Sequence, residues 1–194
     1  MKAQFDKNNI FRRIQSLRSA LIGGTFNALH EGHRNYIKLA FNFAEEVYIL
    51  LSSDKYAKIY KSYQVDPYEI RKKRLENYIF EINGLKQHLI IELDSDYSLI
   101  HFCLYNDVTM AILTPEHYQL FERINRIRED EDKNPLLLLV TQRTSTREGF
   151  NISSTLISNL NYYKQISPTN YSRELAAYAE SLKFSIIQPV NIPK

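Results

Sequence analysis

The sequence has no tryptophan, a single cysteine and no long uninterrupted apolar run. One thiol cannot form a bridge within the chain, so the fold does not depend on a disulfide, and we expect Cys103 to be a buried structural thiol. A membrane span needs about 18 consecutive apolar residues, which no segment offers. The charged N-terminal segment also lacks the apolar core of a signal peptide. We therefore expect a cytoplasmic protein without a membrane partner.

Charge of one sign does not dominate the chain either. The 194 residues include 25 Lys and Arg and 22 Asp and Glu, giving a formal net charge of +3. Because the two signs are mixed along the sequence, the composition does not indicate a nucleic-acid partner. A chain of this length can bury about 70% of the surface that its unfolded form exposes, which favours a single domain over residues 1–194.

The stretch from Gly23 to Arg34 lies between two apolar segments of different kinds. The short run at 20–22 is typical of a buried parallel strand, whereas the apolar residues after the stretch recur at helical spacing. A glycine pair lets the backbone leave a strand in unusual conformations, and the start of a helix offers N–H groups and a positive dipole end to an anion. The segment therefore predicts a phosphate-binding loop between a strand and a helix.

His30 and His33 bracket Gly32 within this loop. Both imidazoles can donate hydrogen bonds to the same phosphate, and the glycine between them lets that phosphate approach the backbone. A zinc site is the weaker alternative, because the remaining histidines have no recognisable ligand spacing. We expect no metal held by protein ligands alone.

The rest of the chain alternates between apolar runs and amphipathic segments. Further strands are predicted at 47–51, 88–93, 108–113 and 136–140, the last apolar throughout and expected to be covered on both faces. Helices are predicted at 32–44, 67–82, 96–104 and 115–130, with short ones after residues 53 and 153. We expect an α/β fold, a Rossmann-like doubly wound five-stranded parallel sheet with helices on both faces and a C-terminal helical tail.

The segment from Gly24 to His33 resembles the G-T-F-D-x-x-H-x-G-H signature of the nucleotidyltransferase superfamily. Later blocks are similar to those of the archaeal and eukaryotic type of phosphopantetheine adenylyltransferase, at 52–54 with 67–71, at 114–116 with 123–128, and at 152–155. The blocks occur in the family's order. They place the core at about 19–160, with a C-terminal extension at 161–194.

The resemblance implies transfer of the adenylyl group of ATP to 4′-phosphopantetheine, which gives dephospho-coenzyme A and pyrophosphate. ATP and phosphopantetheine would be small-molecule substrates, and Mg²⁺ would accompany ATP, bound mostly through phosphate and water. Because the attacking group is already an anion, positioning and charge stabilisation replace a strong general base.

The family's site residues are carried over to matching positions. His33 would contact the reacting α-phosphate, and His30 would hold the triphosphate. The loop residues Gly24, Thr25 and Phe26 would bind substrate, with Thr25 on the phosphate of the acceptor.

Basic and hydroxyl side chains complete the expected phosphate site. A lysine would neutralise the phosphates, and both Lys58 and Lys61 are candidates. Further phosphate contacts are expected from the side chains of Arg71, Arg126, Ser153, Ser154 and Thr155.

Two departures from the family pattern keep other functions open. Asn27 replaces an aspartate, and Leu156 replaces the arginine after I-S-S-T. The alternatives are cytidylyl transfer to an alcohol phosphate, adenylyl transfer to a flavin or nicotinamide mononucleotide, and a nucleotide-binding module without catalysis.

Overall fold

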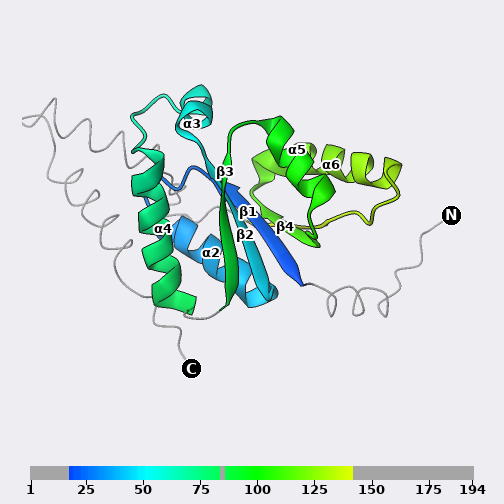
Figure 1. The fold of residues 1–194 in the computed structure, drawn as a ribbon, viewed down its shortest axis with the longest axis horizontal. Coiled ribbons are helices and arrows are strands. Elements are labelled where there is room, and N and C mark those ends of the chain that lie inside the picture. The colour runs from blue at the N-terminus through cyan, green and yellow to red at the C-terminus, as the bar shows by residue number, and fades with distance from the viewer. Residues whose placement is uncertain (1–17, 84–85, 142–194) are drawn as a thin grey trace, which may run out of the picture.

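The computed structural model describes residues 18–83 and 86–141, drawn in colour in Figure 1. The predicted helix near Ser153 and the predicted helical tail lie outside these residues. None of the helices formed by the described residues is both long and apolar enough to cross a bilayer.

Five parallel strands form one sheet, in the order β3-β2-β1-β4-β5. The strands are β1 (Ser19–Gly24), β2 (Glu46–Ser52), β3 (Gln87–Leu93), β4 (Met110–Leu113) and β5 (Leu137–Val140). The chain adds β2 and β3 on one side of β1, and β4 and β5 on the other. The predicted doubly wound, Rossmann-like sheet is therefore confirmed.

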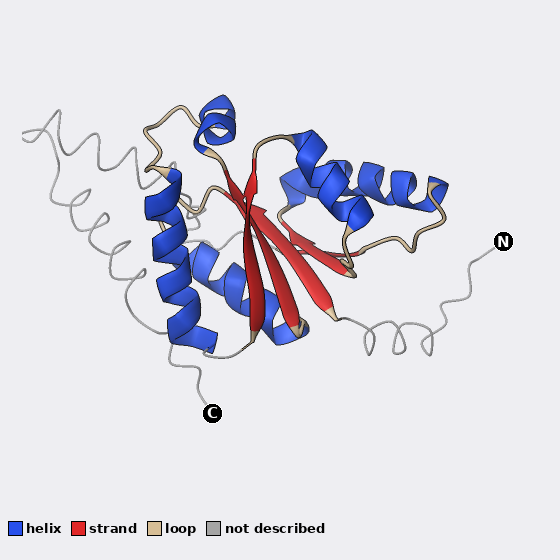
Figure 2. Ribbon diagram, in the orientation of Figure 1, coloured by secondary structure: helices blue, strands red, loops and turns tan. Residues whose placement is uncertain are grey.

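Helices cover both faces of this sheet (Figures 1 and 2). They are α2 (Glu31–Phe43), α3 (Asp54–Tyr60), α4 (Tyr68–Asn83), α5 (Asp96–Tyr105) and α6 (Tyr118–Asp130), with a 3₁₀ turn η1 (Pro115–His117) before α6. Helices α2 and α4 pack on one face, and α5 and α6 on the other. Two connections thus wind in each direction from β1.

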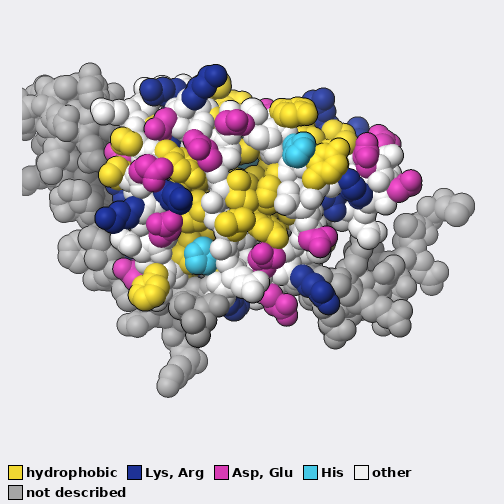
Figure 3. All heavy atoms as spheres, in the orientation of Figure 1, with side chains coloured by type: hydrophobic (Ala, Val, Ile, Leu, Met, Phe, Trp, Pro, Cys, Tyr) yellow, Lys and Arg dark blue, Asp and Glu magenta, His cyan; other side chains and the backbone are white. Residues whose placement is uncertain are grey.

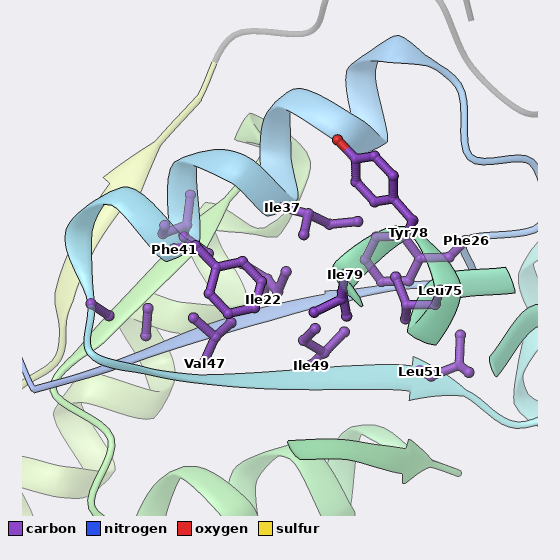
Figure 4. Packing of buried hydrophobic residues seen from close by; sticks show 14 of the residues in the cluster. Ile22, Phe26, Ile37, Phe41, Val47, Ile49, Leu51, Leu75, Tyr78 and Ile79 are labelled. Carbon is purple, nitrogen blue, oxygen red and sulfur yellow. The ribbon is translucent and has the colours of Figure 1, made fainter. Parts of the chain in front are cut away.

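Alternating side chains of the central strands supply two separate cores. Ala20 and Ile22 of β1 face the core under α2 and α4, whereas Leu21 faces the core under α5 and α6. Figure 4 shows Ile37 of α2 and Leu75 of α4 converging on the first of these cores. Each fully buried side chain of this size contributes about 1.5–3 kcal/mol to the stability of the fold. The centre of the sheet therefore holds the loops at its ends in fixed positions.

β5 differs from its prediction. Leu137 is 39% exposed and Val140 is 42% exposed, whereas every residue of β4 is buried. Within the described residues β5 is the end strand, so it has a neighbour on one side only. An unbroken apolar run does not distinguish this position from a central one. Leu138 packs against the core under α5 and α6, and Leu139 against the core under α2 and α4, so β5 is covered on both faces as expected, but only in part.

The sheet opens at its C-terminal edge between β1 and β4. β1 stays in register with β2 up to Gly24 opposite Leu51, but its register with β4 comprises Ala20 opposite Met110 and Leu21 opposite Ala111. The two central strands therefore diverge after Leu21. Since the winding direction reverses at this point, it is where open α/β sheets bind ligands.

Candidate functional site

A tight loop joins β1 to α2 at this crevice. An added Cβ on Gly24 would lie 3.2 Å from the ring of Phe26, so the glycine leaves room for that ring. Phe26 has a left-handed φ of 47° and is 1% exposed. Its ring is part of the core under α2 and anchors the loop. Since the Phe26 side chain is buried, the predicted contact of Phe26 with substrate would have to come from its backbone.

His30 closes the loop and caps the N-terminus of α2. Its Nδ1 accepts a hydrogen bond of 3.3 Å from the backbone N–H of His33. An accepting Nδ1 carries no proton, so the ring proton of neutral His30 is on Nε2. His30 therefore presents an N–H donor from a buried ring.

His33, in the first turn of α2, has the opposite arrangement. Its Nδ1 lies 2.6 Å from the carbonyl oxygen of Ala28. A carbonyl oxygen only accepts, so Nδ1 donates and Nε2 of the neutral ring holds a lone pair. The rings of His30 and His33 stack with 3.8 Å between their centroids. Each ring is thus oriented by its Nδ1, which leaves Nε2 for a ligand.

Burial keeps both rings neutral. Burial, with a smaller contribution from the neighbouring His33, lowers the pKa of His30 to about 3. The pKa of His33 is lowered to about 4. Burial is the largest cause and the positive charge of Lys61 lowers it as well, whereas the hydrogen bond to Ala28 raises it. At neutral pH the loop therefore presents one donor and one acceptor nitrogen in the absence of substrate.

A cavity of about 320 Å³ adjoins the loop, at the C-terminal ends of β1, β2 and β4. Gly24 and Thr25 form part of its wall. Its other polar wall residues are Ser52, Tyr56, Tyr60, Lys61, Asp96, Glu116 and His117. Apolar side chains from β3, α5 and α6 complete it, namely Leu93, Leu99, Leu120 and Phe121. The cavity wall therefore combines polar and apolar side chains from several elements.

The structure distinguishes between the two candidate lysines. Lys61 follows α3, lines the cavity and acts electrostatically on His33. Lys58 lies in the last turn of α3, is exposed and does not line the cavity. Lys61 is thus brought together with Thr25 and the histidines, and Lys58 is not.

Arg71 has a structural position. Its side chain is fully buried, and its Nη1 donates to the carbonyl oxygens of Thr25 at 2.9 Å and Ser52 at 2.8 Å. Nε donates to the carbonyl of Asp66 at 2.7 Å, and Nη2 pairs with Asp54 at 2.8 Å. These contacts tie the loop to β2, α3 and the segment before α4. The predicted phosphate contact of Arg71 is replaced by this positioning role.

Asn27 also supports the loop. Its side-chain Oδ1 accepts a 2.7 Å hydrogen bond from the N–H of Asp66, and its carbonyl accepts one from Arg74. Arg74 in turn pairs with the Asp66 carboxylate at 2.9 Å. An amide oxygen accepts here as a carboxylate oxygen would, so the departure from aspartate preserves the structural bond.

The remaining predicted residues do not meet in the described site. Arg126 is exposed on α6 and does not line the cavity, because the cavity contacts only the start of that helix. The second phosphate segment, Ser153, Ser154 and Thr155, lies outside the described residues, as does Leu156.

Several wall residues were not predicted as site residues, among them Tyr36 and Glu116. Tyr36 follows the helical apolar pattern of α2, but its hydroxyl donates to the carbonyl of Ile112 and it borders the cavity. Glu116 belongs to a block used only for the resemblance, and its negative charge raises the pKa of Tyr36 in addition to the larger effect of burial. Tyr36 matches the helical spacing of apolar residues in α2, so the sequence pattern did not indicate that it borders a cavity.

Two other features do not form a catalytic centre. Within residues 18–83 and 86–141, no group of three or more His, Cys, Asp or Glu could hold a metal ion. A larger cavity of about 970 Å³ lies near the N-terminal ends of β4 and β5. Its buried Arg128 donates to the carbonyls of Cys103, Val108 and Asn134, which is a structural arrangement.

Comparison with known proteins agrees with this geometry. The cytidylyltransferase-like family model matches residues 21–160. A phosphopantetheine adenylyltransferase of Methanosarcina acetivorans is 37% identical over 142 residues, covering 71% of this chain and 86% of the relative. One from Thermococcus gammatolerans is 32% identical over 142 residues, covering 72% and 87%. A structure of a protein of unknown function from Archaeoglobus fulgidus matches with a TM-score of 0.57 at 26% identity, covering 70% of this chain and 99% of that one.

Proposed function

The chain belongs to the cytidylyltransferase-like family, within the group of phosphopantetheine adenylyltransferases, and we propose that it transfers the adenylyl group of ATP to 4′-phosphopantetheine. The products are dephospho-coenzyme A and pyrophosphate. The observation that carries the proposal is the pair of oriented histidines in the loop that contributes Gly24 and Thr25 to the cavity wall, with Lys61 acting on His33. We expect the protein to act in the cytoplasm.

The triphosphate of ATP binds at the N-terminus of α2. Unpaired N–H groups and the helix dipole attract an anion there, and Gly32 allows close approach. His30 donates its Nε2–H to a phosphate oxygen without a change of protonation. The negative charge of the phosphates raises the pKa of His33, so its Nε2 takes up a proton and donates to the α-phosphate.

The transfer step needs positioning more than proton removal. An oxygen of the acceptor phosphate attacks the α-phosphorus in line, and the bond from that phosphorus to the bridging oxygen breaks. The electron pair leaves with pyrophosphate. Protonated His33 and Lys61 stabilise the charge that develops on the phosphoryl oxygens.

The cavity wall suits the acceptor. Phosphopantetheine carries a phosphate at one end of a long uncharged chain with a dimethyl group. The phosphate fits beside Lys61 and Thr25, and the chain fits along Leu93, Leu99 and Leu120.

Mg²⁺ is expected to arrive with ATP as part of the substrate. The cavity wall carries hydroxyls, an ammonium group and the carboxylates of Asp96 and Glu116, and among the described residues no group of three or more His, Cys, Asp or Glu could hold a metal ion. Such a donor set fits a metal held by phosphate oxygens and water, whose charge offsets that of the triphosphate. Ser153, Ser154 and Thr155 stay as proposed ligands of the β- and γ-phosphates.

Asn27 favours catalysis over simple nucleotide binding, because its Oδ1 keeps the bond that holds the loop in place.

Turnover should depend on His33. We expect H33A to lower kcat at least about 100-fold while the KM for ATP changes little, since the contact strengthens in the transition state. Pyrophosphate release with ATP and phosphopantetheine measures this.

A matched control is H101A, which removes an exposed histidine of α5 away from the cavity wall. It should keep the kcat of the wild type. Equal kcat values for H33A and the wild type would refute the proposed role of the loop.

A further inference from the structure

One edge of β3 has no neighbouring strand among the described residues. Within the described residues β3 is an end strand that pairs only with β2. Figure 1 shows it between α4 and α5, and Figure 3 shows hydrophobic side chains gathered on this part of the surface. Leu89 is 53% exposed there. An exposed apolar edge strand is a template for pairing with another strand.

The backbone direction identifies which residues can pair outward. The carbonyl of Leu93 accepts a 2.7 Å hydrogen bond from the N–H of Ser53, so Leu93 directs its backbone groups toward β2. Successive residues of a strand alternate in this direction. The N–H and C=O groups of His88, Ile90 and Glu92 therefore point away from the sheet.

The sequence around Ile90 is self-complementary in an antiparallel pairing. With Ile90 opposite Ile90 of a second copy, His88 lies opposite Glu92, and Leu89 lies opposite Ile91. Every outward backbone group of His88, Ile90 and Glu92 then has a partner. The two polar residues form pairs that can attract, and the exposed Leu89 gains an apolar neighbour.

The side chains agree with this register. His88 and Glu92 are exposed, and both are on the α4 side of the sheet, where His88 lies 6.1 Å from the ring of Phe41. Glu92 raises the pKa of Tyr68 of α4 in addition to the larger effect of burial. Leu89 and Ile91 are on the α5 side. The polar and apolar pairs are therefore separated on the two faces.

We propose that β3 pairs with β3 of a second copy of the chain, antiparallel and centred on Ile90, to form one continuous sheet across a two-fold axis. The occupant of the edge is a second copy because the strand complements itself in hydrogen-bonding direction and in the pairing of polar with polar and apolar with apolar side chains. This interface is independent of the proposed catalytic function.

Charge reversal tests the interface. Sedimentation velocity over a range of micromolar concentrations should show a dimer of the wild type. H88E places two carboxylates opposite one another at both ends of the pairing, and E92K removes the carboxylate that faces His88, so each should raise the dimer Kd about tenfold or more. H88E/E92K restores opposite charges and should recover the Kd of the wild type. The control E129K, on exposed α6, should have no effect.

Cysteine cross-linking tests the register. Leu89 and Ile91 of the two copies form a non-hydrogen-bonded pair, with Cα atoms about 4.5 Å apart, which suits a disulfide. A mixture of L89C and I91C chains should therefore give a cross-linked dimer on oxidation, whereas L89C alone should not. A wild type that stays monomeric, a Kd unchanged in E92K, or cross-linking of L89C alone would overturn the proposal.

Discussion

At the scale of single residues, charged side chains of the same sign have different tasks in this site. The buried guanidinium of Arg71 directs its N–H groups to protein oxygens and fixes three segments around the loop. The ammonium group of Lys61 lines the cavity and acts on His33. One cation therefore holds the structure and the other faces the cavity.

Lys61 and Lys58 form a matched pair for testing this division. K61A should lower kcat/KM for phosphopantetheine about 100-fold, because it removes a preorganised charge beside the transferring phosphate. K58A should change it less than about twofold, since Lys58 is an exposed cation outside the cavity wall. Steady-state kinetics at saturating ATP measures both values. The reverse order of effects would contradict the assignment.

Arg71 should affect stability more than substrate binding. R71M leaves the carbonyls of Thr25 and Ser52 without their buried donor, so the free energy of unfolding should fall by about 3 kcal/mol. R74M removes a 40% exposed side chain and should cost about 1 kcal/mol. Urea unfolding followed by circular dichroism compares the two variants. A raised KM for ATP in R71M without loss of stability would instead indicate a direct phosphate ligand.

At the scale of elements, the N-terminus of α2 joins helix capping to catalysis. The same Nδ1 atom of His30 that caps the helix also determines where its ring proton lies. The adjacent ring of His33 is held by the loop carbonyl of Ala28. The loop and the helix start are therefore one unit, and conditions that protonate the rings also loosen the cap.

This unit predicts how stability depends on pH. The pKa values of about 3 and about 4 lie below the ordinary 6.5, so the unfolded chain binds protons that the folded chain does not. Folding stability should be constant above about pH 7.5 and decrease as the pH falls through 6.5. By pH 5 the loss should be about 2 kcal/mol per histidine.

Thermal unfolding between pH 5 and pH 8, without nucleotide, measures this loss. The double variant H30N/H33N has amides that do not titrate, so its Tm should decrease less over the same range. A double variant with the same pH slope as the wild type would show that other groups cause the loss.

At the scale of the whole molecule, the order of apolar runs was enough to predict the sheet, because central strands between helices have an unmistakable composition. The loop and its histidines were also predictable, since glycines and imidazoles carry the local chemistry. The hydrogen-bond partners of Arg71 could not be predicted, because spacing along the chain does not say which buried carbonyls a guanidinium will contact. The core position of Phe26 depends similarly on a left-handed backbone that sequence periodicity does not show.

The function of the whole molecule is tested most directly by identifying its product. The protein is incubated with Mg²⁺, phosphopantetheine and either ATP or CTP, and the products are analysed by mass spectrometry. We predict dephospho-coenzyme A and pyrophosphate from ATP, with no corresponding product from CTP. A cytidylyl product, or no nucleotidyl product from either nucleotide, would contradict the proposed adenylyl transfer.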